Sequence, residues 1–165
     1  MRSMRRKEYE YIGKRIPRSD ADQQLTGKCR YGDDYFPPNM LVAKARYSDY
    51  AHARILKLDT SEAEKMPGVA AVITYEDVPY NLFGGGPVPD QHVLAEDCVL
   101  YRGDCIAVVA AETREQAEAA AAAVQVEYEP LPTVMTLDEA LAPDAPLVHP
   151  ENFSTNIGKE THMHN

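Results

Sequence analysis

The chain has 165 residues, enough for one domain with a hydrophobic core and a short additional segment. Its 17 basic and 26 acidic residues give a formal charge of −9, which argues against nucleic acid or an anionic membrane as a partner. Its three cysteines lack CxxC spacing, so we expect a reduced, cytoplasmic protein with no zinc or iron–sulfur site of its own. No apolar run approaches the roughly 20 residues of a membrane span, and we expect no secretory or transit peptide.

Residues 1–24 are interpreted as a polar, basic N-terminal arm. Seven of the 17 basic residues lie in the first eighteen positions, namely Arg2, Arg5, Arg6, Lys7, Lys14, Arg15 and Arg18. Two interpretations stay open here: a solvated arm, and an arm that docks on another part of an assembly.

The strongest local pattern lies between residues 94 and 132. Residues 105–111 form a continuous apolar run, typical of a strand covered on both faces. Thr113 and Gln116 have capping-box spacing, and the alanines that follow recur at helical intervals up to Val124. Residues 124–129 then alternate as a half-buried strand that ends at Pro130. A strand–helix–strand unit of this length favours parallel pairing of its two strands.

A second strand–helix–strand unit is expected over residues 53–75. Residues 53–59 alternate, Ser61 and Glu64 indicate a capping box for a short helix, and residues 69–75 form another apolar strand. With a further strand at residues 40–48 and a short helix at residues 136–141, these units predict one α/β domain over residues 25–142. Residues 143–165 are predicted to form a loop-like tail.

A loop rich in glycine and proline, residues 79–91, separates the two units and is expected to be irregular throughout. The glycine triplet alone is weak evidence for phosphate binding, because no GxxxxGK[ST] or GxGxxG signature accompanies it. We favour a surface loop that lines something outside the domain.

The sequence offers few candidates for catalysis. No GxSxG motif occurs, and Cys105 opens an apolar strand, where a buried thiol is the common interpretation. His162 and His164 would give at most a weak terminal metal site. From the residues alone, we therefore predict an α/β domain with no active site.

Eight short stretches, in their order and spacing, resemble one known family. They are Thr26–Tyr31, Ala51–Ile55, Leu58–Ser61, Met66–Val69, Glu76–Pro79, Leu94–Asp97, Tyr101–Asp104 and Val126–Pro132. Together they are similar to the N-terminal α/β-hammerhead domain of the large, molybdenum-binding subunit of xanthine dehydrogenases and aldehyde oxidases. The resemblance runs over about residues 13–157 and implies two strand–helix–strand units around one mixed sheet.

The resemblance implies an architectural role and no catalysis by this chain alone. Family enzymes hydroxylate N-heterocycles or aldehydes with a molybdenum–pterin cofactor, and pass electrons through [2Fe-2S] clusters, usually to FAD. None of these cofactors is expected on this chain. The implied partners are the other molybdenum-binding domains and the iron–sulfur and FAD subunits or domains, and a homodimer is also possible. One loop of the family domain contributes to the wall of the substrate funnel, and here it corresponds to Gly86, Pro87 and Val88.

The sequence departs from many relatives after Gly103, where Asp104-Cys105 replaces Gln-Pro. A proline there would fix φ, so this turn is expected to be freer. The turn sequence, with Gly13-Lys14 and Pro17-Arg18, looks most like bacterial xanthine dehydrogenases, ahead of aldehyde oxidase or carbon monoxide dehydrogenase relatives. Two alternatives stay open: a free-standing module that completes such a complex in trans, and a small enzyme that uses the glycine-rich loop and His92.

Overall fold

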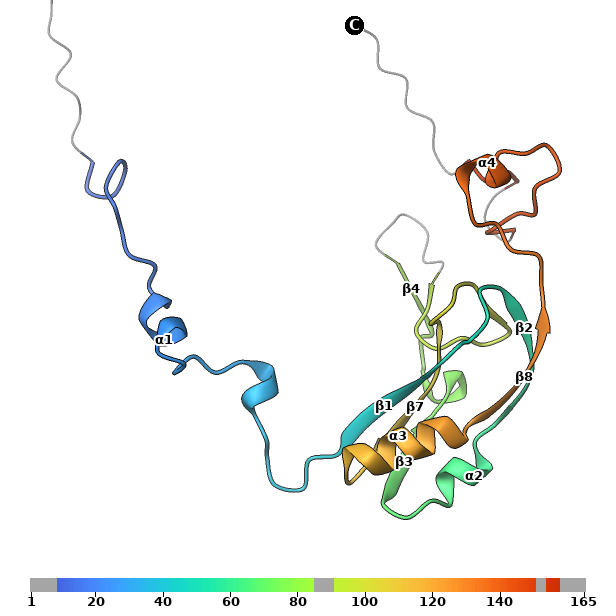
Figure 1. Cartoon of the computed structure of the whole chain (residues 1–165), viewed down its shortest axis with the longest axis horizontal. Helices are drawn as coiled ribbons and strands as arrows, with labels where there is room; N and C mark the ends of the chain where they lie inside the picture. Colours follow the sequence, from blue (N-terminus) through green and yellow to red (C-terminus); the bar gives the residue numbers. More distant parts are fainter. Residues whose placement is uncertain (1–8, 85–90, 151–153, 158–165) are drawn as a thin grey trace, which may run out of the picture. The chain divides into compact units, whose positions relative to one another are not determined.

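A computed structural model of the chain describes residues 9–84, 91–150 and 154–157 (Figure 1). The contacts within the chain divide it into two units, Met1–Pro38 and Asn39–Asn165. Each unit is described by itself. None of the described helices is both long enough and apolar enough to cross a membrane.

Two three-stranded sheets form the body of the unit Asn39–Asn165. The first sheet has the order β1-β7-β3, with the bounds Val42–Tyr47, Cys105–Ala111 and Val69–Ile73. The second has the order β6-β2-β8, with the bounds Cys98–Val99, Ala53–Asp59 and Gln125–Pro130. Every strand pair among the described residues is antiparallel.

Both predicted strand–helix–strand units are present, but the expected parallel pairing within one mixed sheet is wrong. Each unit passes from one sheet to the other: β2 leads through α2 (Ser61–Glu64) to β3, and β7 leads through α3 (Arg114–Ala123) to β8. Strand β7 has no free edge for β8, because β1 and β3 occupy its two edges. Strand β8 therefore pairs with β2.

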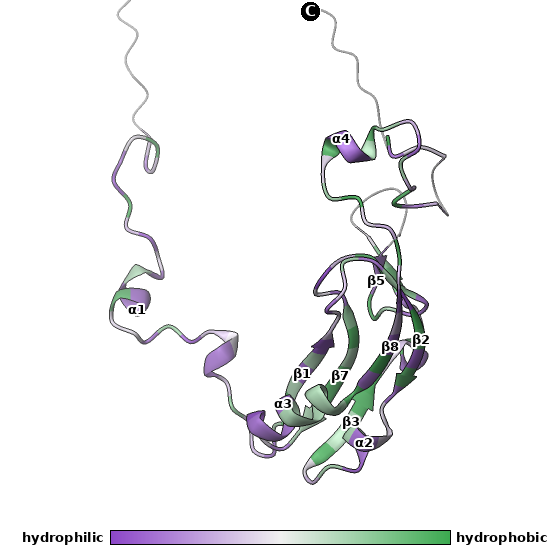
Figure 2. Cartoon of the chain, turned by 45° about the vertical axis from the view of Figure 1, so that its right-hand side comes forward, coloured by the Kyte–Doolittle hydropathy of each residue, from purple (hydrophilic) through white to green (hydrophobic). Residues whose placement is uncertain are grey.

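Helix α3 and strand β7 build the core as predicted. Thr113 accepts a hydrogen bond from the backbone N–H of Gln116, whose side chain accepts from the Thr113 backbone N–H. The helix buries Ala117, and its Ala120 and Ala121 pack in a core cluster that includes Val109 of β7. Alanine ends at Cβ, so the helix lies close to the sheet, whose strands β3 and β7 are mainly hydrophobic in Figure 2.

Helix α2 lies where it was expected, but its N-terminal cap differs. The predicted capping box of Ser61 and Glu64 is wrong, because the helix begins at Ser61 itself. The carboxylate of Asp59, at the end of β2, accepts from both the backbone N–H and the hydroxyl of Ser61, at 3.1 and 2.7 Å. These hydrogen bonds, with the nearby Lys57 ammonium, lower the pKa of Asp59 to about 2.

The end of the described chain is a loop-like segment after α4 (Leu137–Ala140). The side-chain amide of Asn156 donates to the carbonyls of Ala140 and Pro146 and accepts from the backbone N–H of Val148. This one residue thus holds Ala140, Pro146 and Val148 together by satisfying backbone groups that regular structure does not satisfy.

The unit Met1–Pro38 contains only short elements in its described part, residues 9–38. They are α1 (Ala21–Leu25) and a 3₁₀ turn, η1 (Gly32–Asp34). Its described residues are all exposed or half-buried.

Candidate functional site

The glycine- and proline-rich loop leaves the body through a two-stranded ribbon of β4 (Leu82–Phe83) and β5 (Gln91–His92). Leu82 pairs with His92 and Phe83 with Gln91. The expectation of an irregular segment from residue 79 to residue 91 is therefore wrong at its two ends. The candidate funnel residues Gly86, Pro87 and Val88 lie outside the described residues.

Asn81 fixes the base of this loop to the core. Its side-chain amide donates to the Leu94 carbonyl at 2.9 Å and accepts from the Leu94 backbone N–H at 3.0 Å. Its carbonyl also accepts from the Val93 backbone N–H at 2.9 Å. Leu94 and Ala95 are buried, and Ala95 donates to the carbonyl of Cys105 in β7. We call residues 81–83 and 91–94 the loop base.

Asn81 could not be identified from the sequence, because its role depends on a contact thirteen residues further along the chain. An asparagine before an irregular segment is common in turns, where its side chain bonds to the local backbone. The residues around Asn81 do not show whether its side chain bonds to the local backbone or to a residue further along the chain.

The turn at residues 100–104 is held by Asp104, so the absence of a proline does not leave it unsupported. The buried Asp104 carboxylate accepts from the Leu100 backbone N–H at 3.0 Å. Its carbonyl accepts from the Ser48 backbone N–H at 2.8 Å, and the Gly103 N–H donates to the Ser48 carbonyl at 3.0 Å. Gly103 has a φ of 94°, which a residue with a side chain rarely adopts.

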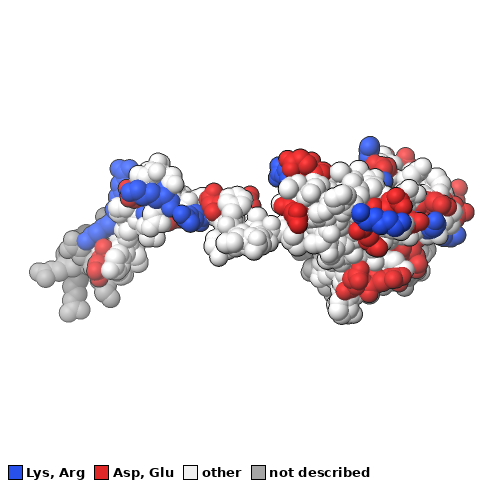
Figure 3. All heavy atoms as spheres, turned by 90° about the horizontal axis from the view of Figure 1, so that it is seen from below, with Lys and Arg blue, Asp and Glu red and all other residues white. Residues whose placement is uncertain are grey.

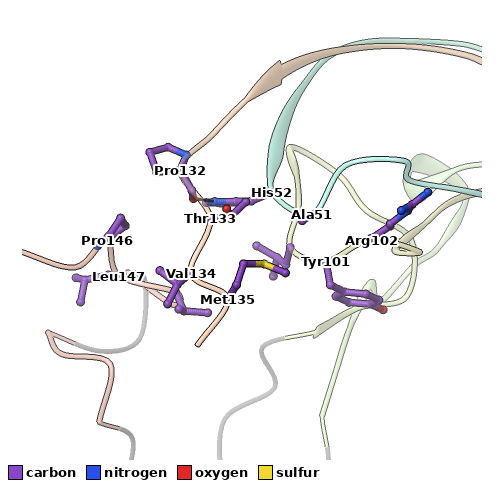
Figure 4. A pocket seen from close by; sticks show the side chains of 12 residues that line it. Ala51, His52, Tyr101, Arg102, Pro132, Thr133, Val134, Met135, Pro146 and Leu147 are labelled. Carbon is purple, nitrogen blue, oxygen red and sulfur yellow. Dashed lines mark hydrogen bonds between the residues drawn. The ribbon is translucent and has the colours of Figure 1, made fainter. Parts of the chain in front are cut away.

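A mainly apolar pocket of about 220 Å³ lies between this turn and the chain after β8 (Figure 4). In Figure 4 the His52 ring lies beside Thr133, and Met135 extends toward the side that Tyr101 forms. The lining residues are Ala51, His52, Leu100, Tyr101, Arg102, Pro132, Thr133, Val134, Met135, Pro146, Leu147 and Val148. Such a wall suits an apolar side chain better than a charged substrate.

His52 has a structural position in this pocket. Its Nδ1 donates to the Pro132 carbonyl at 2.7 Å, and its own carbonyl accepts from the Leu131 backbone N–H at 3.0 Å. These contacts hold the chain after β8 beside β2. The hydrogen bond from Nδ1 fixes the orientation of the imidazole ring, and Nε2 is the ring nitrogen that remains for a further hydrogen bond.

The remaining candidate residues do not converge on a reactive centre in the described part of the chain. His92 is half-buried in β5, and His162 and His164 lie outside the described residues. Burial and the nearby Asp104 carboxylate raise the pKa of the Cys105 thiol, which disfavours the nucleophilic thiolate. Within residues 9–84, 91–150 and 154–157, no group of three or more His, Cys, Asp or Glu side chains could hold a metal ion.

The fold is identified by its match to a known protein family. The profile described as "Aldehyde oxidase and xanthine dehydrogenase, a/b hammerhead domain" matches residues 26–132. The chain belongs to this family. The α/β-hammerhead fold implied by the eight sequence stretches is therefore confirmed, although the predicted strand pairing within it is wrong.

Curated relatives are molybdenum hydroxylases or their subunits. The hammerhead domain is 48% identical over 133 residues to a probable xanthine dehydrogenase subunit of Bacillus subtilis, covering 80% of this chain and 18% of that protein. It is 36% identical over 157 residues to the nicotinate dehydrogenase large molybdopterin subunit of Eubacterium barkeri, covering 95% and 36%. The chain thus spans between about a fifth and a little over a third of the length of these relatives.

Solved structures give the same result. The aldehyde oxidoreductase of Desulfovibrio gigas superposes with a TM-score of 0.77 at 38% identity, over 82% of this chain and 16% of that one. The Cu,Mo-CO dehydrogenase superposes with a TM-score of 0.73 at 38% identity, over 82% and 17%. These matches cover the hammerhead domain of longer enzymes, and they do not favour a free-standing module. Family enzymes bear molybdopterin, iron–sulfur clusters and FAD on other domains.

Proposed function

We propose that this hammerhead domain serves a xanthine dehydrogenase-like molybdenum hydroxylase that acts on purines. In this proposal it packs beside the domains that hold the molybdenum–pterin cofactor, and the loop with Gly86, Pro87 and Val88 contributes a wall of the substrate funnel. The domain does not catalyse by itself. The observation that carries the proposal is the family match over residues 26–132, combined with the anchored loop base.

The anchoring of the loop base supports a role as a wall. A loop that shapes a substrate passage must leave the domain at a fixed point, because loosely held contacts lose selectivity. The two side-chain hydrogen bonds of Asn81 and the β4–β5 ribbon fix that point against buried Leu94.

The loop base and the apolar pocket also lie toward one end of the domain. In Figures 1 and 2, β4, β5 and α4 lie at the end of the unit opposite α2 and α3. We infer that this end faces the cofactor domains. The apolar lining of the pocket beside His52 supports contact with another protein surface, since exposed apolar concavities mark such sites.

The purine substrate class is supported by the 48% identity to the probable xanthine dehydrogenase subunit of Bacillus subtilis, compared with 36% to the nicotinate dehydrogenase subunit. We propose iron–sulfur and FAD subunits or domains as further partners, with a homodimer as a possible assembly.

We also propose a basic arm over residues 1–24, the domain itself over residues 25–142, and a connecting tail over residues 143–165. A cytoplasmic location is supported by Cys29, Cys98 and Cys105, among which the described structure has no disulfide.

The test is a substitution in the funnel loop of the complete enzyme that carries this domain. Val88→Trp is expected to lower kcat/KM for xanthine about tenfold, with unchanged molybdenum content, because it narrows the passage. Ala119→Trp, at an exposed position of α3 at the other end of the domain, is the matched control. Equal activity of the two variants would contradict a wall role for the loop.

A further inference from the structure

The unit Met1–Pro38 exposes large apolar side chains and buries none of its described residues. The exposed fractions are 63% for Tyr11, 71% for Ile12, 60% for Tyr31, 71% for Tyr35 and 73% for Phe36. A segment of about 30 residues without a core cannot stabilise itself, since domains below about 40 residues need outside support. These side chains therefore need a surface to cover them.

The segment nevertheless carries preset local structure. Asp20 accepts from Arg18 and Gln24, which frames α1, and the Gln23 carbonyl accepts from the backbone N–H groups of Lys28 and Cys29. The Asp34 carboxylate accepts from the Tyr31 backbone N–H at 3.0 Å across η1. Preset turns lower the entropy that a segment loses when it docks.

The charge of the segment differs from that of the body. Residues 1–38 contain 9 basic and 6 acidic residues, a net charge of 9 − 6 = +3, whereas residues 39–165 contain 8 and 20, a net charge of 8 − 20 = −12. Figure 3 shows lysine and arginine gathered on the segment and acidic residues widespread on the body. A complementary partner surface combines apolar area with a negative rim.

The match to one curated relative extends into this segment. The family profile starts at residue 26, but the match to the Eubacterium barkeri large molybdopterin subunit extends over 157 of 165 residues. At most 165 − 157 = 8 residues lie outside that match, so it runs through the segment. In that relative the hammerhead match covers only 36% of the polypeptide, which leaves a large surface for docking.

We propose that residues 9–38 are a docking arm that packs through its aromatic side chains on an acidic-rimmed apolar surface of the cofactor-bearing part of the same large subunit. This inference rests on the proposed function, because it assumes a large subunit with cofactor domains. It assigns the arm a role in joining the hammerhead domain to those domains.

The test is amide hydrogen exchange over residues 9–38 in the complete enzyme and in the chain of residues 1–165. We expect exchange at least ~100-fold slower in the complete enzyme than in the shorter chain. Equal exchange in both would overturn the docking. Equally slow exchange in the shorter chain, together with its dimerisation in sedimentation, would also overturn it, since a second copy would then be the occupant.

Two variants sharpen the test in the complete enzyme. Tyr35→Ser with Phe36→Ser, and Lys14→Glu with Arg15→Glu, are each expected to restore fast exchange over residues 9–38. Tyr47→Ser, at an exposed position of β1, is the control that leaves this exchange slow. Fast exchange over residues 9–38 in the unmodified enzyme overturns the docking, even if that enzyme oxidises xanthine. An enzyme without xanthine turnover and molybdenum would instead contradict the proposed function.

Discussion

Gly68 lies against the side chain of Gln116, so that the turn before β3 closes on the first turn of α3. A Cβ atom added to Gly68 would meet the Gln116 side-chain amide at a distance no real contact shows. Gly68 has a φ of +80°, and its carbonyl accepts from the Glu112 backbone N–H at 2.9 Å. The two strand–helix–strand units therefore meet at a point where a side chain would strain the backbone and displace the end of the Gln116 side chain.

Replacement of Gly68 by alanine is predicted to destabilise the domain by about 1–2 kcal/mol, from the left-handed backbone and from displacement of the Gln116 side chain, which accepts from the Thr113 backbone N–H. Chemical unfolding of the purified chain measures this difference. The double variant Gly68→Ala, Gln116→Ala is predicted to lose less stability than the sum of the single variants, because the clash is gone. Strict additivity would show that the side chain of Gln116 is not the obstacle.

The cap of α3 is predicted to contribute more than the similar cap of α4. Thr113→Ala removes the acceptor for the Gln116 backbone N–H and should lower the unfolding free energy by about 1 kcal/mol. Thr136→Ala removes the corresponding bond to Glu139, but α4 buries no residue in the core. We therefore expect the change for Thr136→Ala to be the smaller of the two in urea unfolding. The reverse order would contradict the assignment of α3 to the core.

Asp59 is predicted to make stability depend on pH in the acid range. Its pKa is about 2 in the folded protein, below the ordinary value of 3.8, because Ser61 and Lys57 favour the carboxylate. Because its pKa is lowered on folding, the Asp59 carboxylate stabilises the fold at pH values above 3.8. This stabilisation is lost as the pH falls from 3.8 toward 2. Asp59→Asn should therefore be less stable than the original chain at pH 5 and nearly equal at pH 2. A constant difference across this range would exclude the carboxylate charge as the cause.

Asn81 is predicted to matter for both the fold and the funnel. Asn81→Ala leaves the Leu94 backbone N–H and carbonyl without their partner, which should cost about 1–3 kcal/mol. In the complete enzyme the same variant is expected to lower kcat/KM for xanthine, since the loop base is no longer fixed. Asn156→Ala, which loosens the segment after α4 instead, serves as the control for general destabilisation. If Asn81→Ala and Asn156→Ala have equal stability and lower kcat/KM equally, the result would argue against a specific role for the loop base.

The sequence predicted those elements that depend on short-range patterns. The apolar run of β7, the capping box at Thr113 and the alanine face of α3 lie within about twenty residues, and the structure contains all three. Strand pairing could not be predicted in the same way. Strand β8 pairs with β2 because β1 and β3 already occupy β7, and that competition involves residues far apart in the chain.

The hydrogen-bond partners of the Asp59 and Asn81 side chains could also not be predicted from the sequence. The spacing of Ser61 and Glu64 fits a capping box, yet Asp59 bonds to Ser61 because β2 ends beside the helix. Asn81 reaches Leu94 only after the loop has returned. The eight family stretches identified the domain where these contacts could not, since the resemblance depends on order and spacing along the chain.

We propose that this hammerhead domain belongs to a molybdenum hydroxylase that oxidises purines. The most direct measurement is molybdenum content and dye-linked xanthine oxidation of the complete large subunit purified with its partners, beside the chain of residues 1–165. We predict about one molybdenum and xanthine turnover for the complete enzyme, and neither for the shorter chain. Stoichiometric molybdenum with turnover in residues 1–165, or a complete enzyme without molybdenum, would contradict the claim.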